Sequence, residues 1–323
     1  MLEVSGLSVA YETGETPVRA VEDVSFSVDR GEFLGIVGES GCGKSTLLFA
    51  VAQLLTPPAR ITAGSVTFSG KNLVTMTDRQ LAPVRWQSMS VVMQSAMNAL
   101  NPVKTVGAQF ADAMRAHGTR SRAEIKSRSE EVLALVGIDR AHLRSYPHQL
   151  SGGMRQRAMI AMALLFTPDL VIMDEPTSAL DVVAQRSLMT QIKGLQAHLG
   201  FAIIFVTHDM SLVSHFSDRL MVMYAGQIAE LGPTRTIFDS PLHPYSTGLL
   251  EAFPSIRGAR VPLTGIPGSP PDLSIVPDGC SFLPRCPAKV DECATTRPAL
   301  VARGETEVRC VLHDPAVMKV THD

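Results

Sequence analysis

A glycine-rich segment with a lysine and a serine is the strongest chemical signal in the 323-residue sequence. The pattern GxxxxGKS runs from Gly38 to Ser45, between an apolar strand-like run and a helical run. The glycines let backbone N–H groups curl around phosphate oxygens at a helix N-terminus, Lys44 supplies positive charge, and Ser45 offers a hydroxyl to Mg2+. The segment predicts a P-loop that binds a nucleotide. Its predicted binding residues are Gly38, Ser40, Gly41, Cys42, Gly43, Lys44, Ser45 and Thr46, with Cys42 interpreted as a small tolerated residue rather than a redox group.

An acidic pair follows another apolar run. In "DLVIMDEPTSALD" the run ends at Asp174, where a carboxylate can hold Mg2+ directly or through water. The neighbouring Glu175 can orient or deprotonate an attacking water. An isolated Asp-Glu pair after a strand is usually a solvated turn, but a P-loop in the same chain favours the catalytic interpretation.

A third segment carries a second phosphate-binding pattern. Ser151, Gly152 and Gly153 precede a helical run in "LSGGMRQR", which again combines a hydroxyl with backbone N–H groups at a helix start. Because the chain already has a P-loop, a second phosphate-binding helix N-terminus is explained if it contacts a nucleotide that another subunit holds. With this segment the sequence resembles the ATP-binding cassette (ABC) ATPases, whose signature motif is LSGG. The resemblance covers about residues 1–240, with the expected motifs in order.

The resemblance implies further nucleotide-site residues. Tyr11 matches the aromatic residue that stacks on adenine, although an aromatic after "LSV" is also ordinary in a strand. Gln94 matches the Q-loop glutamine, which senses Mg2+ and the γ-phosphate and links the core to a helical insertion. The implied Mg2+ ligands are therefore Ser45, Gln94 and Asp174.

The resemblance also implies the mechanism. His208 matches the switch histidine at the γ-phosphate, although a lone histidine after a strand is usually structural. Ser178 to Asp181 match the D-loop of the dimer interface, with Asp181 bordering the nucleotide. Two cassettes then close head to tail over two ATP molecules, and hydrolysis reopens them. The expected catalytic residues are Lys44, Gln94, Glu175 and His208.

The elements that must position these residues can be read from the apolar pattern. Short runs such as "LSVAYE" and "GSVTFSG" in the first hundred residues indicate strands. A helix is expected from Ser121 to Gly137 and another through "MRQRAMIAMALL", whereas "DLVIMDEP" and "FAIIFVTHD" indicate buried parallel strands. With the resemblance, we expect an α/β fold: a RecA-like P-loop NTPase core, an antiparallel β subdomain and a helical signature subdomain at about residues 100–157.

Bulk composition excludes some classes of protein. A formal charge of −2 with 19% charged residues gives no basic field that attracts nucleic acid. The start lacks an export signal, and no apolar run approaches the roughly 20 residues that span a bilayer. We therefore expect a cytoplasmic chain that reaches a membrane only through partners.

After about residue 235 the sequence becomes rich in Pro and Gly. The ATPase domain is therefore expected over residues 1–235, and a loop-rich extension with one short helix near "STGLLEAF" over residues 236–323. The extension resembles that of oligopeptide, dipeptide and nickel importer ATPases, in "HPY" at 243–245 and in the GC…PRCP pattern. The resemblance implies an importer ATPase at the cytoplasmic face of the inner membrane, with two permease subunits and an external substrate-binding protein. The "IPGSPPDL" stretch is similar to the first, D-type cassette of a heterodimeric pair, which implies a non-identical second ATPase.

Four of the five cysteines, Cys280, Cys286, Cys293 and Cys310, lie in this extension. In a reducing cytosol, clustered cysteines favour metal or redox chemistry over disulfides, and their spacing lacks the paired CxxC of zinc ribbons. Four thiolates from irregular loops suit a [4Fe-4S] cluster, and a proline after a ligand recurs in such sites. A zinc site and free thiols or a disulfide remain alternatives. Several members of the resembled family bind a cluster at these positions.

Other functions remain open on the sequence. Oligosaccharides or nickel are alternatives to peptides, because this chain does not choose the substrate. A soluble ABC ATPase acting on DNA or ribosomes is a further alternative, although such proteins carry coiled coils, zinc modules or tandem cassettes. The last alternative is a redox-responsive regulator in which the cysteine cluster carries the main function.

Overall fold

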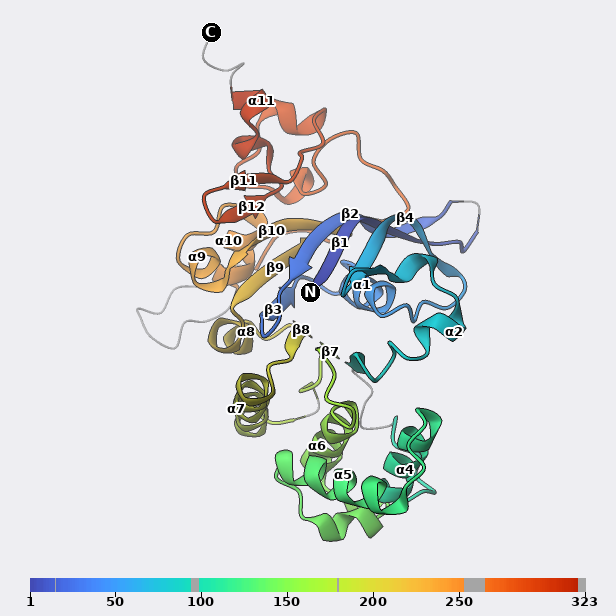
Figure 1. The fold of residues 1–323 in the computed structure, drawn as a ribbon. Coiled ribbons are helices and arrows are strands. Elements are labelled where there is room, and N and C mark those ends of the chain that lie inside the picture. The colour runs from blue at the N-terminus through green and yellow to red at the C-terminus, as the bar shows by residue number, and fades with distance from the viewer. Residues whose placement is uncertain (15, 94–98, 179, 253–264, 319–323) are drawn as a thin grey trace. The chain divides into compact units, whose positions relative to one another are not determined.

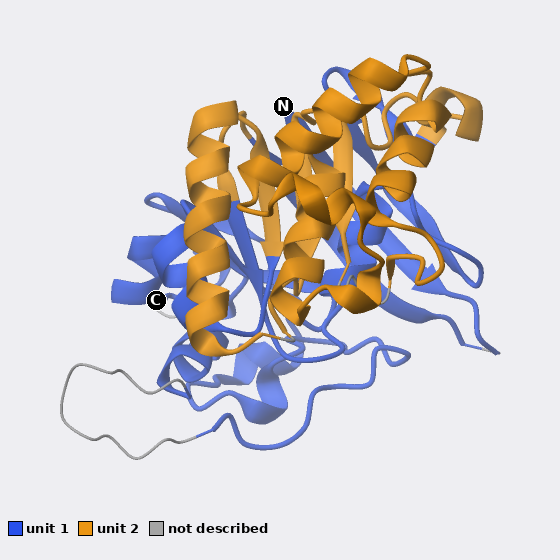
Figure 2. Cartoon of the chain, turned by 90° about the horizontal axis from the view of Figure 1, so that it is seen from below, with its two compact units in different colours: residues 1–28, 34–74, 206–323 blue, residues 29–33, 75–205 orange. Residues whose placement is uncertain are grey.

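The computed structural model describes residues 1–14, 16–93, 99–178, 180–252 and 265–318. The chain divides into two compact units, each assembled from separate segments (Figure 2). Unit 1 takes residues 1–28, 34–74 and 206–323, and unit 2 takes residues 29–33 and 75–205. The predicted Gln94 and one residue of the predicted D-loop, Ala179, lie outside the described residues.

Unit 1 begins with an antiparallel sheet of four strands in the order β2-β1-β4-β5 (Figure 1). Its strands are β1 (Leu2–Tyr11), β2 (Val18–Val28), β4 (Ala59–Phe68) and β5 (Lys71–Asn72). Burial alternates along β2 because one face of the sheet packs inward. This sheet is the antiparallel subdomain that the sequence predicted.

A second group of strands in unit 1 has the order β11-β12-β10-β9-β3. Its strands are β3 (Phe33–Val37), β9 (Arg219–Tyr224), β10 (Gln227–Pro233), β11 (Val301–Arg303) and β12 (Thr306–Val308). Strands β3 and β9 are parallel, and β12 pairs with β10 through Glu230 and Val308. The C-terminal extension therefore continues the sheet that contains β3, the strand leading into the P-loop.

Short helices complete unit 1. Around the sheets lie α1 (Lys44–Val51), α8 (Met210–Phe216), α9 (Thr234–Asp239), α10 (Pro244–Glu251) and α11 (Pro315–Met318). The extension otherwise folds as loops with 3-10 turns at Leu283–Arg285, Asp291–Ala294 and Val311–His313. The predicted short helix is present as α10 and begins at Pro244, before the "STGLLEAF" stretch.

Unit 2 holds the longer helices and three short strands. The strands are β6 (Met89–Val92), β7 (Leu170–Asp174) and β8 (Ala202–Val206), whose last residue is counted with unit 1. β6 and β7 are parallel, and every residue of β7 and β8 is buried, as the continuous apolar runs predicted. The helices are α2 (Asp78–Leu81), α4 (Val106–Ala116), α5 (Arg122–Leu135), α6 (Gly152–Ala163) and α7 (Val182–Leu199).

Helix α5 has its last helical residue at Leu135, and the glycine at which the sequence placed the stop follows its C-cap. Val136 is its C-cap, and Gly137 has a φ of 70°. The Ile138 N–H donates to the Leu133 carbonyl and the Gly137 N–H to the Ala134 carbonyl, the pattern of a Schellman motif. Among all described helices, none combines the length and hydropathy needed to cross a bilayer.

Candidate functional site

The P-loop lies in unit 1 between β3 and α1, and its glycines are required by close backbone contacts. Gly38 has a φ of 153°, and a Cβ there would lie 2.3 Å from the Met223 carbonyl oxygen. Gly43 has a φ of 103°, and a Cβ would lie 2.1 Å from the Ala20 carbonyl oxygen. Real side chains do not tolerate such approaches, so only glycine fits. The P-loop backbone therefore packs closely against β2 at Gly43 and against the end of β9 at Gly38.

Lys44 is held inside its own loop. Its Nζ donates to the carbonyl oxygens of Gly38, at 2.7 Å, and Glu39, at 2.8 Å, and only 9% of the residue is exposed. The Cys42 sulfur lies 3.6 Å from the same Nζ. Burial raises the pKa of the Cys42 thiol, so this residue stays a neutral thiol at neutral pH. The ammonium group is thus fixed at the centre of the loop.

The structure brings two further predicted residues of unit 1 near this loop. The Tyr11 hydroxyl, on β1, lies 3.0 Å from the Thr46 hydroxyl on α1. The Thr207 N–H donates to the Ile36 carbonyl of β3, which places the backbone just before His208 beside the strand that leads into the loop. The His208 side chain itself is exposed.

In unit 2 the predicted acidic pair ends strand β7. Asp174 is 4% exposed, and its carboxylate oxygens are the kind of ligand that Mg2+ prefers. Glu175 has a φ of 46°, a left-handed conformation that is unusual for this residue type and often marks functional positions. The strand therefore ends in a backbone bend that directs the second carboxylate.

Two other predicted residues of unit 2 cap helices. The Ser151 hydroxyl accepts from the Met154 N–H at 3.3 Å, so Gly152 and Gly153 form the first turn of α6. The Asp181 carboxylate accepts from the Ala184 N–H at 2.8 Å at the start of α7. The two caps fix the orientation of the N-termini of α6 and α7. Both cap residues are exposed, as a predicted contact with a nucleotide or a partner requires.

Four thiols gather in the extension within unit 1. The Cys280 N–H donates to the Cys293 carbonyl at 2.8 Å, and Cys293 and Cys310 are buried. Burial first, and then the other thiols of the group, raise the pKa of Cys280 and Cys286, and raise that of Cys310 to about 11. Across the described ranges, however, no three or more His, Cys, Asp or Glu side chains are arranged to hold a metal ion. The thiols are therefore neighbours, but not a formed metal-binding group.

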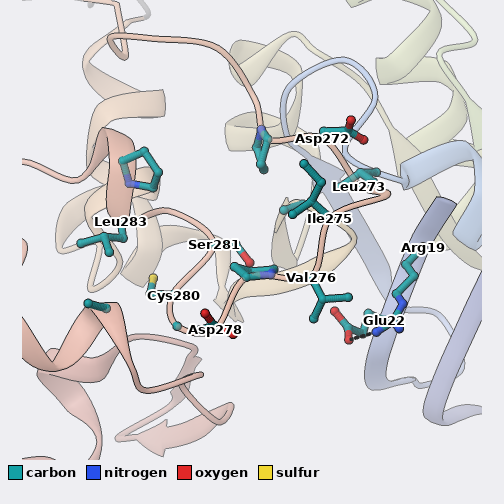
Figure 3. A pocket seen from close by; sticks show the side chains of 16 residues that line it. Arg19, Glu22, Asp272, Leu273, Ile275, Val276, Asp278, Cys280, Ser281 and Leu283 are labelled. Atoms are coloured by element: carbon teal, nitrogen blue, oxygen red, sulfur yellow. Dashed lines mark ion pairs between the residues drawn. The ribbon is translucent and has the colours of Figure 1, made fainter. Parts of the chain in front are cut away.

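A pocket of about 320 Å³ separates this cysteine segment from β2 (Figure 3). Cys280, Ser281 and Leu283 line one side, and the ion pair of Arg19 and Glu22, 3.6 Å apart, lies on the other. The backbone at the rim is tied to β2, because the Arg19 N–H donates to the Leu273 carbonyl at 3.1 Å.

Comparison with known proteins agrees with these motifs. A family model described as ABC transporter matches residues 21–178, and one described as the C-terminal region of oligopeptide/dipeptide transporters matches residues 229–293. The oligopeptide transport ATP-binding protein OppD of Salmonella typhimurium is 43% identical over 300 residues, which cover 92% of this chain and 89% of the relative. This chain belongs to the ATP-binding subunits of the oligopeptide/dipeptide ABC transporters.

Another relative and a solved structure support this membership. The dipeptide transport ATP-binding protein DppD of Bacillus subtilis is 41% identical over 318 residues, which cover 97% of this chain and 95% of the relative. A dimeric ATP-binding cassette solved in a post-hydrolysis state with ADP and phosphate matches with a TM-score of 0.65 and 28% identity, over 73% of this chain and 99% of that one. The predicted ABC cassette fold and the predicted transport ATPase are thus confirmed.

The contacts of Glu39 were not foreseen from the sequence. Its carboxylate forms an ion pair with Arg285 of the extension, 246 residues later in the chain. Glu39 lies at a variable position of the P-loop pattern, and Arg285 was noted only within the PRCP match. No local signal connects the two residues, because a sequence pattern does not report a contact over that separation.

Proposed function

We propose that this ABC ATPase powers the uptake of oligopeptides or dipeptides. The observation that carries the proposal is the match of residues 229–293 to the C-terminal region of oligopeptide/dipeptide transporters, a segment outside the ATPase motifs. Relatives that align over nearly the whole chain are named for oligopeptide or dipeptide transport, which supports peptides over oligosaccharides or nickel.

In the proposed cycle, the P-loop binds the phosphates of ATP. The backbone N–H groups at the start of α1 face the phosphates, and Lys44 exchanges the carbonyl oxygens of Gly38 and Glu39 for phosphate oxygens. The Tyr11 ring supports the adenine. The Ser45 hydroxyl and the Asp174 carboxylate are the groups that would hold Mg2+, which would supply positive charge to neutralise the phosphates.

The proposed chemical step is the attack of water on the γ-phosphate. Glu175 accepts a proton from that water, and Lys44 and His208 stabilise the charge on the transferring phosphoryl group. Gln94, the remaining predicted catalytic residue, lies outside the described residues. The signature residues Ser151, Gly152 and Gly153 act on the nucleotide of a second cassette, and Asp181 lies at that interface.

The second cassette in this proposal is a different chain. The support is the "IPGSPPDL" stretch of the extension, which is similar to the first of two non-identical cassettes. The complete transporter also contains two permease subunits in the inner membrane, with this chain at their cytoplasmic side, and a binding protein outside.

We further propose that Cys280, Cys286, Cys293 and Cys310 are the ligands of a [4Fe-4S] cluster. Four soft thiol donors within one loop-rich segment support this assignment. The described side chains include no formed metal-binding group, so a cluster would require these four thiols to move into a ligand arrangement. The raised thiol pKa values mean that binding releases protons. Iron and acid-labile sulfide in protein purified without oxygen would support a cluster, whereas iron-free, colourless protein would count against it.

Reconstitution tests the transport proposal. The complex that copurifies with this chain from membranes is placed in proteoliposomes, and its ATPase rate is measured with the binding protein empty or loaded. Stimulation by a peptide-loaded binding protein supports peptide import. Stimulation only by an oligosaccharide or by nickel would replace peptides as the substrate, and a copurifying ribosome or nucleic acid would overturn the transport role.

A further inference from the structure

Glu39, the residue that follows the first P-loop glycine, is bonded through each of its polar groups. Its N–H donates to the Tyr245 hydroxyl at 2.9 Å, and its carbonyl accepts from Lys44 Nζ at 2.8 Å. Its carboxylate accepts two bonds from Arg285, at 2.7 and 2.8 Å. Two of these three partners, Tyr245 and Arg285, belong to the C-terminal extension. The extension and the catalytic lysine are therefore joined through one residue of the loop.

Arg285 is built into the extension as a rigid donor. Its side chain is 4% exposed, and its Nε donates to the Pro267 carbonyl at 2.8 Å. The guanidinium carbon lies 5.8 Å from the centre of the Tyr224 ring, within range of a cation–π contact. An arginine guanidinium keeps its charge throughout the accessible pH range. A planar two-donor group held in this way fixes both oxygens of the carboxylate.

Aromatic side chains hold the same region in place. The ring centres of Tyr224 and Tyr245 are 4.6 Å apart, and Phe282 lies 5.1 Å from Tyr224 and 5.5 Å from Tyr245. Tyr245 is fully buried, and Phe282 is 2% exposed. Phe282 and Arg285 both lie between Cys280 and Cys286. Packing of the loop between these two cysteines therefore holds the Arg285 guanidinium against the Glu39 carboxylate of the P-loop.

We propose that Arg285 is a positioning residue for nucleotide binding. It neutralises the Glu39 carboxylate and, with Tyr245, holds the P-loop backbone in the conformation that receives phosphate. An unpaired carboxylate in a loop that binds a polyphosphate would repel it, and the partial burial of Glu39 limits the screening of that repulsion by water. This inference rests on the proposed role of the P-loop and Lys44 in binding the nucleotide.

The inference differs from a purely structural role for Arg285. If Arg285 only stabilised the fold, replacing it would lower the unfolding temperature and leave the affinity of the folded protein unchanged. If it positions the P-loop, affinity falls in protein that is still folded. Removing the Glu39 charge as well should then restore part of that affinity, because the repulsive carboxylate is gone.

The experiment compares two buried arginines of the extension in the full-length chain. Arg285→Met removes the bond to the P-loop. Arg309→Met is the matched control, because Arg309 is 10% exposed at its side chain and bonds Ile228, Pro298 and Asp23, all outside the P-loop. Affinity for fluorescent N-methylanthraniloyl-ADP with Mg2+ is measured by titration, and thermal unfolding is recorded without nucleotide.

We expect Arg285→Met to raise the dissociation constant about tenfold, while Arg309→Met lowers the unfolding temperature and leaves affinity within about twofold. Adding Glu39→Gln to Arg285→Met should lower the dissociation constant again. Equal affinity losses in the two arginine variants, unchanged affinity in Arg285→Met, or no recovery in the double variant would each overturn the inference. Should Arg285→Met not fold, Arg285→Gln, which also removes the charge but retains a polar side chain, is tested by the same criteria. Lys44→Ala tests the underlying role separately, since unchanged binding there would refute the proposed nucleotide site itself.

Discussion

At the scale of single residues, Glu175 combines a carboxylate with a left-handed backbone at the end of a buried strand. We expect Glu175→Gln to retain ATP binding and to lose about 10²–10⁴-fold in turnover, because the amide cannot accept the proton of the attacking water. Binding is measured with a fluorescent nucleotide, and turnover as phosphate release by the assembled transporter. Near-normal turnover would remove Glu175 from its catalytic role.

The P-loop glycines allow a second test at this scale. Gly43 and Gly41 both have a positive φ, 103° and 79°, but a Cβ meets the Ala20 carbonyl oxygen only at Gly43, whereas nothing lies within 4 Å at Gly41. Both alanine variants carry the backbone cost of a left-handed conformation, so their difference isolates the steric contact.

We therefore expect Gly43→Ala to lower the free energy of unfolding by about 2 kcal/mol more than Gly41→Ala does. Chemical denaturation of both variants provides the measurement. Equal losses would mean that the loop can move away from β2 without cost.

Local patterns predicted the residues of the P-loop, the Asp-Glu pair and the signature segment, because each stands within a few positions of its neighbours. They did not predict how those residues are supported. The ion pair of Glu39 with Arg285 joins positions 246 residues apart, a separation over which no local pattern reports a contact. Local patterns therefore name candidate residues, whose chemical roles stay predictions, and they do not report the long-range contacts that hold those residues.

At the scale of elements, helix α10 begins at a cap that depends on pH. The His243 Nδ1 accepts from the Tyr245 N–H at 2.9 Å, so this nitrogen must be unprotonated. The fully buried Glu230 of β10 accepts from the Leu242 and His243 N–H groups at 2.8 and 3.0 Å. Burial, with a smaller contribution from the nearby His313, lowers the pKa of His243 to about 4.

This shift predicts acid destabilisation. Between about pH 6.5 and 4 the unfolded chain binds a proton at His243 that the folded chain excludes, so the free energy of unfolding falls as pH falls. The contribution is complete above pH 6.5, and its total is on the order of 3 kcal/mol. His243→Asn retains a capping acceptor without titrating, so its unfolding temperature should depend less on pH in this window.

The control is His198→Asn, which changes an exposed histidine in the last turn of α7 and should keep the pH dependence of the unchanged chain. The unfolding temperature is measured by differential scanning calorimetry at several pH values. Parallel pH profiles for His243→Asn and the unchanged chain would show that the cap does not titrate in this range.

The sequence predicted strands with continuous apolar runs more easily than hairpins closed by unusual turns. The β9–β10 hairpin turns at Ala225 and Gly226, whose φ values are 50° and 78°. An alanine in a left-handed position gives no turn signal of the kind that Asn-Gly provides. Strands β11 and β12 have three residues each, too few for alternation to be recognised.

At the scale of the whole chain, the extension and the P-loop belong to the same compact unit. Strand β12 pairs with β10, and β3 and β9 share that group of strands. Unit 1 draws on three separate stretches of sequence, an assembly that no composition shift reveals. The boundary near residue 235 marks a change in composition and stays a prediction as a domain limit.

Assembly with a second cassette gives a prediction at this scale. Val182 and Val183, directly after Asp181, are 76% and 81% exposed, which is unusual for two adjacent apolar residues. If the D-loop meets a partner cassette, Val183→Asp should lower the ATPase rate of the assembled transporter about tenfold. An acidic residue in the first turn of α7 favours the helix dipole, so the chain's own stability should not fall.

The matched control for this prediction is Ile275→Asp in the extension, where another apolar residue is 68% exposed. Both variants are tested for nucleotide affinity as isolated chains and for ATPase rate in the complex. If only Val183→Asp lowers the ATPase rate, and both variants keep the nucleotide affinity of the unchanged chain, the defect lies in the association of the two cassettes. Equal rates in the two variants would mean that these exposed valines do not meet a partner during the cycle.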